Sequence, residues 1–251
     1  MNKCTRKLEV CVDSFAGLMA ARKGGADRIE LCSSLIDGGL TPSAGLMQAA
    51  AQIGIPCHVM IRPRNGDFNY DRHDIEIMAH DISNVHLYNL NGVVFGIEDG
   101  SGNLDTTALR YLMDEAQGLN TTLHRVVDVI ADRMRAVDVA VKLGFDRILT
   151  SGGAQNADIG TAEIAKMVQH AGEAIIIMPG GGITPRNVAQ ISRATGTNEF
   201  HASCSLEKSE LLSNIFTERP LLYTSAYVVR KMKAALRELE GFSDKVVRLM
   251  P

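Results

Sequence analysis

The sequence has no tryptophan and no marked excess of charge of one sign. Its formal net charge is −3 over 251 residues. A chain without a basic excess is not expected to bind nucleic acid or an anionic membrane surface through bulk charge. The hydrophobic share of 45% is ample for one large core. We therefore expect a single domain over residues 1–251.

Long apolar runs and paired cysteines are also missing. No stretch reaches the roughly 18 apolar residues of a membrane span, and the opening residues, Met1 to Lys7, lead into no apolar run of secretory-signal length. The five cysteines, at positions 4, 11, 32, 57 and 204, are widely spaced and form no Cys-x-x-Cys pair. This pattern argues against a disulfide scaffold or a zinc finger and predicts a reducing, cytoplasmic compartment.

Apolar runs of strand length alternate with amphipathic helical stretches along most of the chain. Strict alternation predicts a parallel sheet with helices outside it. Eight repeats favour closure into a (β/α)8 TIM barrel over an open doubly wound sheet. The turn at 12–17 reads VDSFAG, which does not fit the glycine pattern of a dinucleotide-binding fold.

The pattern assigns most of the chain to elements. The expected strands are Leu8–Val12, Arg28–Cys32, Cys57–Ile61, Gly92–Ile97, Thr121–Val127, Arg147–Thr150, Ala174–Met178 and Glu199–Ser203. The expected helices, counted from any capping residue, are Ser14–Lys23, Thr41–Ile53, Asp74–Tyr88, Asp105–Gln117, Ala131–Leu143, Asp158–Ala171, Pro185–Ala194 and a closing helix Ala226–Leu239. Leu206–Pro220 yields no assignment.

An internal repeat supports the barrel. The string GADRIEL at 25–31 resembles GFDRILT at 144–150. These strings contain the second and sixth expected strands, which lie half a barrel apart.

Two expected strands carry a glutamate and a cysteine at the same spacing. Glu9 and Cys11 share one face of the first strand, and Glu30 and Cys32 share one face of the second. If these faces point inward, two carboxylates and two thiols enter the barrel. Alternatively, the cysteines are small buried hydrophobic residues, and the glutamates form structural ion pairs with an inward arginine.

The third strand ends in two arginines, Arg62 and Arg64, around a proline that ends the strand. Because function in a TIM barrel gathers at the C-terminal ends of the strands, both are expected at the functional rim. Arginine suits bidentate contact with a carboxylate or phosphate. Arg62 could equally pair with Glu30 or Glu9, and both interpretations can hold together.

Two histidines lie in expected strands. His124 could act as a general base or a metal ligand, or could be satisfied structurally. His201 shares a face with Ser203 in the eighth strand. Since this strand neighbours the first in a closed barrel, we expect His201 near Glu9 and Cys11.

The loops after the sixth and seventh strands are rich in glycine. The first contains Ser151 and Gly152, and the second contains Gly180, Gly181 and Gly182 immediately before a helix. Such loops let backbone N–H groups approach an anion, and the helix dipole favours negative charge. A tight turn without a ligand is the alternative.

At these residues the chain resembles the CutC family of copper homeostasis proteins. The matching strings run in order over residues 8–204: EVCVDS at 9–14, GGADRIELCS at 24–33, GGLTPS at 38–43, MIRPR at 60–64, GDF at 66–68, GVVFG at 92–96, HR at 124–125, RILTSG at 147–152, PGGGI at 179–183 and EFHAS at 199–203. The chain departs from the family pattern at Val126-Val127, and over Cys204–Pro220, where the family has a basic segment.

The resemblance implies a cytoplasmic (β/α)8 barrel linked to copper tolerance, and a homodimer or homotetramer. Some members bind Cu(I) through cysteines that match Cys11 and Cys32, and soft thiolates do favour Cu(I). The first hypothesis is therefore a Cu(I)-binding homeostasis protein that uses this pair.

The second hypothesis is a TIM-barrel enzyme acting on a small anionic metabolite, phosphorylated or carboxylated. The two rim arginines and the glycine loop at 180–182 would hold the anion. Proton transfer would fall to Glu9, Glu30 or His124. A scaffold without chemistry is disfavoured, because it has little reason to bury ionisable residues.

Overall fold

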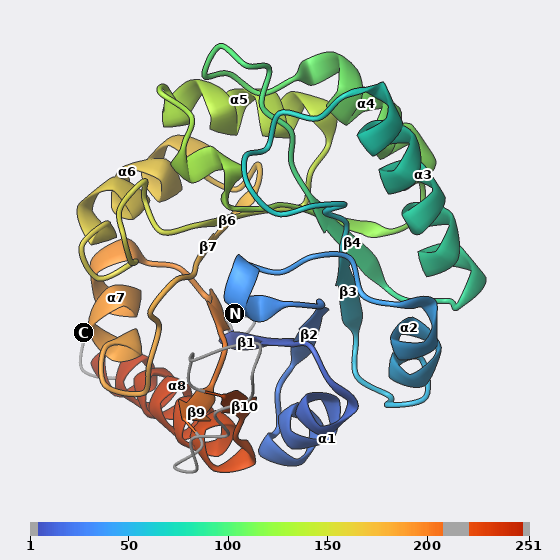
Figure 1. Ribbon diagram of the computed structural model, residues 1–251. Coiled ribbons are helices and arrows are strands. Elements are labelled where there is room, and N and C mark those ends of the chain that lie inside the picture. The colour runs from blue at the N-terminus through green and yellow to red at the C-terminus, as the bar shows by residue number, and fades with distance from the viewer. Residues whose placement is uncertain (1–4, 208–220, 248–251) are drawn as a thin grey trace.

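Eight parallel strands form a ring at the centre of the molecule, and helices surround it (Figure 1). This computed structural model describes residues 5–207 and 221–247. Within them, hydrogen bonds join the strands in the order β7-β6-β5-β4-β3-β2-β1-β8. Strands β7 and β8 lie side by side and nearly complete the ring. The predicted (β/α)8 barrel is confirmed.

The barrel strands are β1 (Lys7–Val12), β2 (Arg28–Leu31), β3 (Cys57–Met60), β4 (Gly92–Phe95), β5 (Asn120–Leu123), β6 (Arg147–Thr150), β7 (Ile176–Pro179) and β8 (Glu199–Ala202). The helices are α1 (Phe15–Gly24), α2 (Ala44–Ala50), α3 (Arg72–Leu87), α4 (Thr106–Glu115), α5 (Arg133–Leu143), α6 (Thr161–Ala171), α7 (Val188–Thr195) and α8 (Ala226–Val247). The shorter elements are the 3₁₀ helices η1 (Leu35–Asp37) and η2 (Arg125–Asp128), and the strands β9 (Ser205–Glu207) and β10 (Leu222–Thr224).

Side-chain caps begin several helices where the sequence predicts them. The Ser14 hydroxyl accepts a hydrogen bond from the backbone N–H of Gly17, and Asp105 caps α4 in the same way. Gly144 ends α5 in the left-handed conformation, at φ 88°. The expected helix start at Thr41 is wrong: Ser43 caps α2, because Thr41 is hydrogen bonded to the backbone of Arg62, just after β3.

The prediction of a strand over Thr121–Val127 is also wrong at its C-terminal end. Strand β5 stops at Leu123, and the His124 imidazole accepts a hydrogen bond from the backbone N–H of Val126 at 3.1 Å. This side-chain cap turns the chain into η2, although two valines follow. In the unassigned segment, residues 208–220 lie outside the described residues, and β9 and β10 on either side of them pair antiparallel.

Each barrel strand is buried on both faces, but the two faces differ. Leu8, Val10 and Val12 of β1 belong to the main hydrophobic core between the ring and the helices. Glu9 and Cys11 alternate with them and face the interior of the ring. The Glu-x-Cys spacing therefore does bring polar side chains into the barrel.

A buried ionic network fills the lower part of the barrel. Arg28 donates to Glu9, and its second amino group donates to Glu199 at 2.8 Å. From the opposite side, Arg147 donates to the same oxygen of Glu199 at 3.3 Å. Each of these four residues is at most 6% exposed. The expected structural ion pair between Glu9 and an inward arginine is confirmed, and that arginine is Arg28.

The internal repeat has a structural basis in this network. Asp27 accepts a hydrogen bond from the backbone N–H of Leu8 in β1, and Asp146 accepts one from the backbone N–H of Thr121 in β5, each at 2.7 Å. The arginine that follows each aspartate points inward to Glu199. The repeated Gly-x-Asp-Arg thus places two arginines on opposite sides of one carboxylate.

Helix α8 closes the molecule against α1. A Cβ at Gly24 would lie 2.3 Å from Val229, so glycine permits this close approach. Lys233 of α8 also forms an ion pair with Asp27, which ties the helix to the start of β2. Within the described residues, no helix combines the length and the apolar composition that a membrane span requires.

We expect Arg28→Met to lower the free energy of unfolding by about 3–5 kcal/mol, because it leaves Glu9 and Glu199 short of a buried counter-charge. Lys7→Met is the matched control. Lys7 pairs with the same Glu199 at 3.6 Å, but its side chain is 56% exposed, so its loss should cost less than about 1 kcal/mol. Urea unfolding of both variants measures the difference, and equal losses would contradict the proposed role of the network.

Candidate functional site

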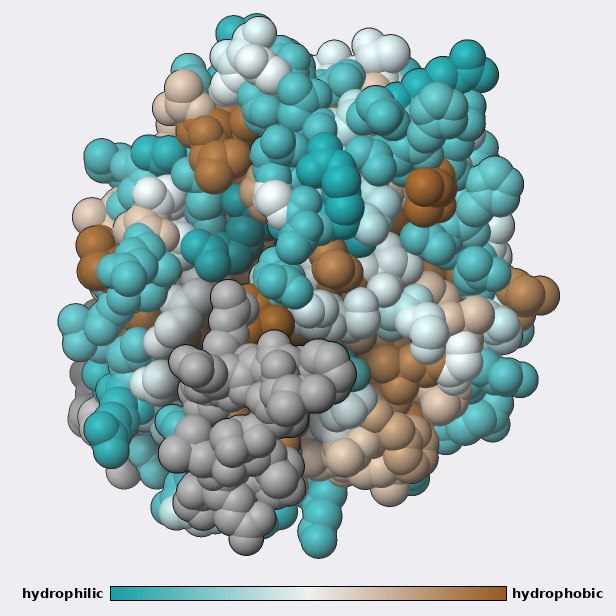
Figure 2. All heavy atoms as spheres, viewed as in Figure 1, coloured by the Kyte–Doolittle hydropathy of each residue, from teal (hydrophilic) through white to brown (hydrophobic). Residues whose placement is uncertain are grey.

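A cavity of about 1570 Å³ opens at the C-terminal ends of the strands. The face of the molecule in Figure 2 is mostly hydrophilic, and hydrophobic residues gather at its lower right. Predicted site residues from several strands line this cavity together: Cys11, Glu30, Arg62, His124, Gly181, Gly182, His201 and Ser203. The structure thus brings these residues together at one end of the barrel.

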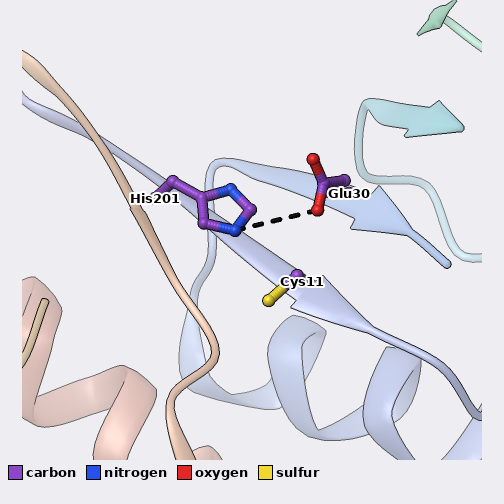
Figure 3. Close-up of side chains that lie close together, drawn as sticks. All are labelled: Cys11, Glu30 and His201. Carbon is purple, nitrogen blue, oxygen red and sulfur yellow. Dashed lines mark ion pairs between the residues drawn. The ribbon is translucent and has the colours of Figure 1, made fainter. Parts of the chain in front are cut away.

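Three of these residues form a compact cluster. Cys11 from β1, Glu30 from β2 and His201 from β8 point toward one another (Figure 3). Each contributes one potential ligand atom, and these atoms all lie within 4.8 Å of one another. All three side chains are buried. A thiol, a carboxylate and an imidazole at this spacing are a plausible set of metal ligands.

Glu9 fixes the orientation of His201 from below. The Nδ1 of His201 lies 2.8 Å from Glu9 Oε1, as the sequence predicts, while Oε2 of Glu9 accepts from Arg28. Although burial alone would raise the pKa of Glu9, the guanidinium of Arg28 holds that pKa well below its usual range. Because Glu9 is then an acceptor, Nδ1 of His201 carries a proton and Nε2 faces the cluster. Metal-binding histidines are commonly oriented by a carboxylate in this way.

Glu30 and His201 form an ion pair within the cluster. Their Oε2 and Nε2 atoms are 3.7 Å apart. Burial raises the pKa of Glu30. Burial alone would lower the pKa of His201, but the Glu30 carboxylate raises it well above its usual range. The other oxygen of Glu30, Oε1, is buried without a hydrogen-bond partner among the described residues, which leaves it free to meet a ligand.

Cys32 lies beside this cluster but is not one of its three residues. It is fully buried, and its thiol donates to Glu30 Oε2 at 3.5 Å. It packs with Met60, whose thioether side chain also lines the cavity. The cluster is therefore bordered by two further sulfur atoms.

The two predicted rim arginines have different positions. Arg62 lines the cavity, but it donates to the backbone carbonyls of Asp37, Gly39 and Gly66. The expectation that it pairs with Glu30 or Glu9 is wrong, because three loop carbonyls already surround its guanidinium. Arg64 lies outside the cavity lining and pairs with Asp74 at 2.9 Å.

The loop residues also divide into two groups. Gly181 and Gly182 line the cavity, whereas Ser151, Gly152 and Gly180 do not. The Ser151 hydroxyl is fully engaged by neighbouring groups of η2 and its own loop. We therefore expect Ser151 to shape the loop and the glycines at 181 and 182 to meet a ligand.

Arg125 and Asp128 line the cavity but were not among the predicted site residues. Asp128 accepts hydrogen bonds from Thr150 and from the backbone of the loop after β6, and it pairs with Arg125 at 2.8 Å. Arg125 thereby stands at the rim. The sequence signal was present in the string HR at 124–125, but a strand over 121–127 would have pointed the two side chains to opposite faces.

Comparison with known proteins agrees with this architecture. A family model described as the CutC family matches residues 6–206. The chain belongs to the CutC family. CutC of Caulobacter vibrioides is 48% identical over 238 residues, which cover 92% of this chain and 97% of that protein. CutC of Agrobacterium fabrum is 44% identical over 234 residues, covering 91% and 93%.

Solved structures give the same result. CutC from Streptococcus agalactiae, named a copper homeostasis protein, has a TM-score of 0.76 at 34% identity, covering 79% of this chain and 99% of that one. Thiamine phosphate pyrophosphorylase from Pyrococcus furiosus has a TM-score of 0.59 at 15% identity, covering 93% and 96%. The latter likeness concerns the fold alone. The resemblance to CutC proteins is thus confirmed.

The buried histidines predict how stability depends on pH. Burial lowers the pKa of His58, which lies inside the barrel below the cavity, from 6.5 to about 3. Below pH 6.5 the unfolded chain therefore binds a proton that the folded chain does not, and stability falls as pH falls toward 3. We expect His58→Gln to reduce this slope by about 1.4 kcal/mol per pH unit.

Urea unfolding over this pH range measures the slope. His73→Gln is the control, because the His73 side chain is 85% exposed, and it should leave the slope unchanged. Identical slopes in the wild type and the His58 variant would show that His58 is not held neutral in the folded protein.

Proposed function

We propose that this CutC protein binds Cu(I) in the cytoplasm, and that Cys11 and His201 are its principal ligands. The proposal is carried by one observation: Cys11, Glu30 and His201 present three buried ligand atoms within 4.8 Å of one another. The cargo is copper because the family is linked to copper homeostasis and because soft ligands select Cu(I).

The surroundings of the cluster support an ion of low charge. A Cu(I) ion bound to the thiolate of Cys11 carries no net charge, so its burial adds little electrostatic cost. Nε2 of His201 can supply the second ligand once its proton leaves, since Glu9 retains the proton on Nδ1. Binding would accordingly release protons. The sulfur atoms of Cys32 and Met60 add soft donors next to the cluster.

The two cysteines differ in position, because Cys11 belongs to the cluster and lines the cavity, whereas Cys32 does neither. Burial raises the pKa of the Cys32 thiol well above its usual range, and the Glu30 carboxylate adds to this effect. Cys32 also donates to Glu30. We therefore propose that Cys11 binds first and that Cys32 strengthens the site, which refines the pairing of Cys11 with Cys32 implied by the family.

We expect Cys11→Ser to weaken Cu(I) binding by about a hundredfold or more, because a ligand is lost. Anaerobic titration against a competing Cu(I) chelator measures this. Cys57→Ser is the matched control: Cys57 is 1% exposed and free, but it belongs to the outer hydrophobic core and does not line the cavity. Its loss should leave the affinity unchanged.

Cys32→Ser should fall between these two variants. If Cys11→Ser binds Cu(I) as tightly as the wild type, the proposed site is wrong. If Zn(II) binds more tightly than Cu(I) in the same competition, the site exists but copper is not its cargo. The dimer or tetramer expected from the family is a separate proposal, which light scattering of the purified protein tests.

A further inference from the structure

We propose that the cavity holds a second binding site, for an oxyanion: the carboxylate or phosphate group of a small molecule. The site lies at the ends of β3 and β5 and at the loop after β7, and its residues are distinct from the Cys11–Glu30–His201 cluster. The argument uses none of the copper ligands, so it does not depend on the proposed function.

His124 supplies a buried hydrogen-bond donor that lacks an acceptor. Its Nδ1 accepts from the backbone N–H of Val126, which leaves the proton on Nε2. That atom is buried without a hydrogen-bond partner among the described residues, and the side chain, 3% exposed, lines the cavity. An unmet buried donor is costly. A ligand acceptor in the cavity would remove that cost.

Arg62 supplies a buried positive charge that has no paired carboxylate in the described part of the chain. It is 5% exposed and its hydrogen bonds go to carbonyl oxygens of the backbone. Among the described residues, no carboxylate lies within ion-pairing distance. Its guanidinium lies over the ring of Phe68, at 5.1 Å, and the same ring contacts His124 at 4.7 Å. The charge and the free donor thus flank one aromatic side chain, and a buried lone charge favours an anionic partner.

Arg125 and the loop after β7 add further hydrogen-bond donors to the proposed oxyanion site. Arg125 is held by Asp128 and Ser151 through two of its nitrogens. Its third nitrogen, Nη1, lies over Gly181, where a Cβ would come within 3.3 Å of it. Gly181 and Gly182 both have positive φ values and line the cavity. Because neither residue carries a side chain, a ligand in the cavity can approach the backbone of this loop closely.

The chemistry of these groups selects the ligand class. The His124 imidazole is held neutral, because burial and the charge of Arg62 lower its pKa to about 3. It therefore remains a hydrogen-bond donor at neutral pH and is a poor base. In this part of the cavity, His124, Arg62 and Arg125 provide hydrogen-bond donors and positive charge. These groups suit an oxyanion and repel a metal ion.

Two substitutions of His124 distinguish the roles of its two ring nitrogens. Asparagine places an acceptor near the Nδ1 position and removes the Nε2 donor, whereas glutamine places an amide donor near Nε2. Binding of inorganic phosphate and, separately, of malonate is followed by chemical-shift titration of the ¹⁵N-labelled protein. We expect saturable shifts at His124 Nε2–H and at the amides of Gly181 and Gly182.

His124→Asn should weaken this binding by about tenfold or more, and His124→Gln should retain most of it. Preference for phosphate or malonate identifies which group the natural ligand carries. Arg64→Gln is the control, because Arg64 pairs with Asp74 outside the cavity, and it should bind as the wild type does.

Two results would overturn the proposal. One is the absence of saturable shifts with either anion. The other is a folded His124→Asn variant that binds both anions as tightly as the wild type. Cu(I) affinity is measured on the same variant and should be unchanged, so the copper and oxyanion sites stand or fall separately. Loss of Cu(I) binding together with the anion would contradict two distinct sites.

Discussion

The buried carboxylate of Glu9 connects the framework of the barrel to its candidate site. One oxygen accepts from Arg28, which belongs to the ionic network in the lower barrel, and the other faces His201 Nδ1 at 2.8 Å. Arg28 keeps Glu9 ionised despite complete burial. Because Glu9 is ionised, His201 presents Nε2 to Cys11 and Glu30. The orientation of the site therefore depends on a salt bridge one layer beneath it.

The polar groups inside the barrel form two layers. Those in the lower layer are paired with one another, whereas some of those at the cavity lack partners among the described residues. Below, two glutamates meet two arginines, and their charges cancel. At the mouth, Glu30 Oε1 and His124 Nε2 have no hydrogen-bond partner in the described part of the chain. A protein gains nothing in stability from such groups. Two different ligands would satisfy these two groups. A metal ion could bind the Glu30 carboxylate beside the thiol of Cys11, and an oxyanion could accept from His124 beside Arg62.

Much of the fold and part of the site could be predicted from the sequence. Parallel strands buried on both faces give continuous apolar runs. The Glu-x-Cys spacing predicts that each glutamate shares a face with its cysteine, and the structure shows that this face points inward. Closure of the ring correctly placed His201 near Glu9 and Cys11. The partners of Arg62 could not be predicted, because they are backbone carbonyls that carry no sequence signal. The end of β5 was predicted wrongly because Val126 and Val127 are residues typical of strands, although the cap formed by His124 starts a turn there.

X-ray absorption at the copper edge of the Cu(I)-loaded protein tests most directly whether His201, oriented by Glu9, completes the site with Cys11. We predict a mixed shell of sulfur and imidazole nitrogen, whose imidazole contribution disappears in His201→Gln while bound copper remains detectable. A shell of sulfur atoms alone, unchanged in that variant, would contradict the arrangement and would leave the orientation of His201 without a role in binding copper.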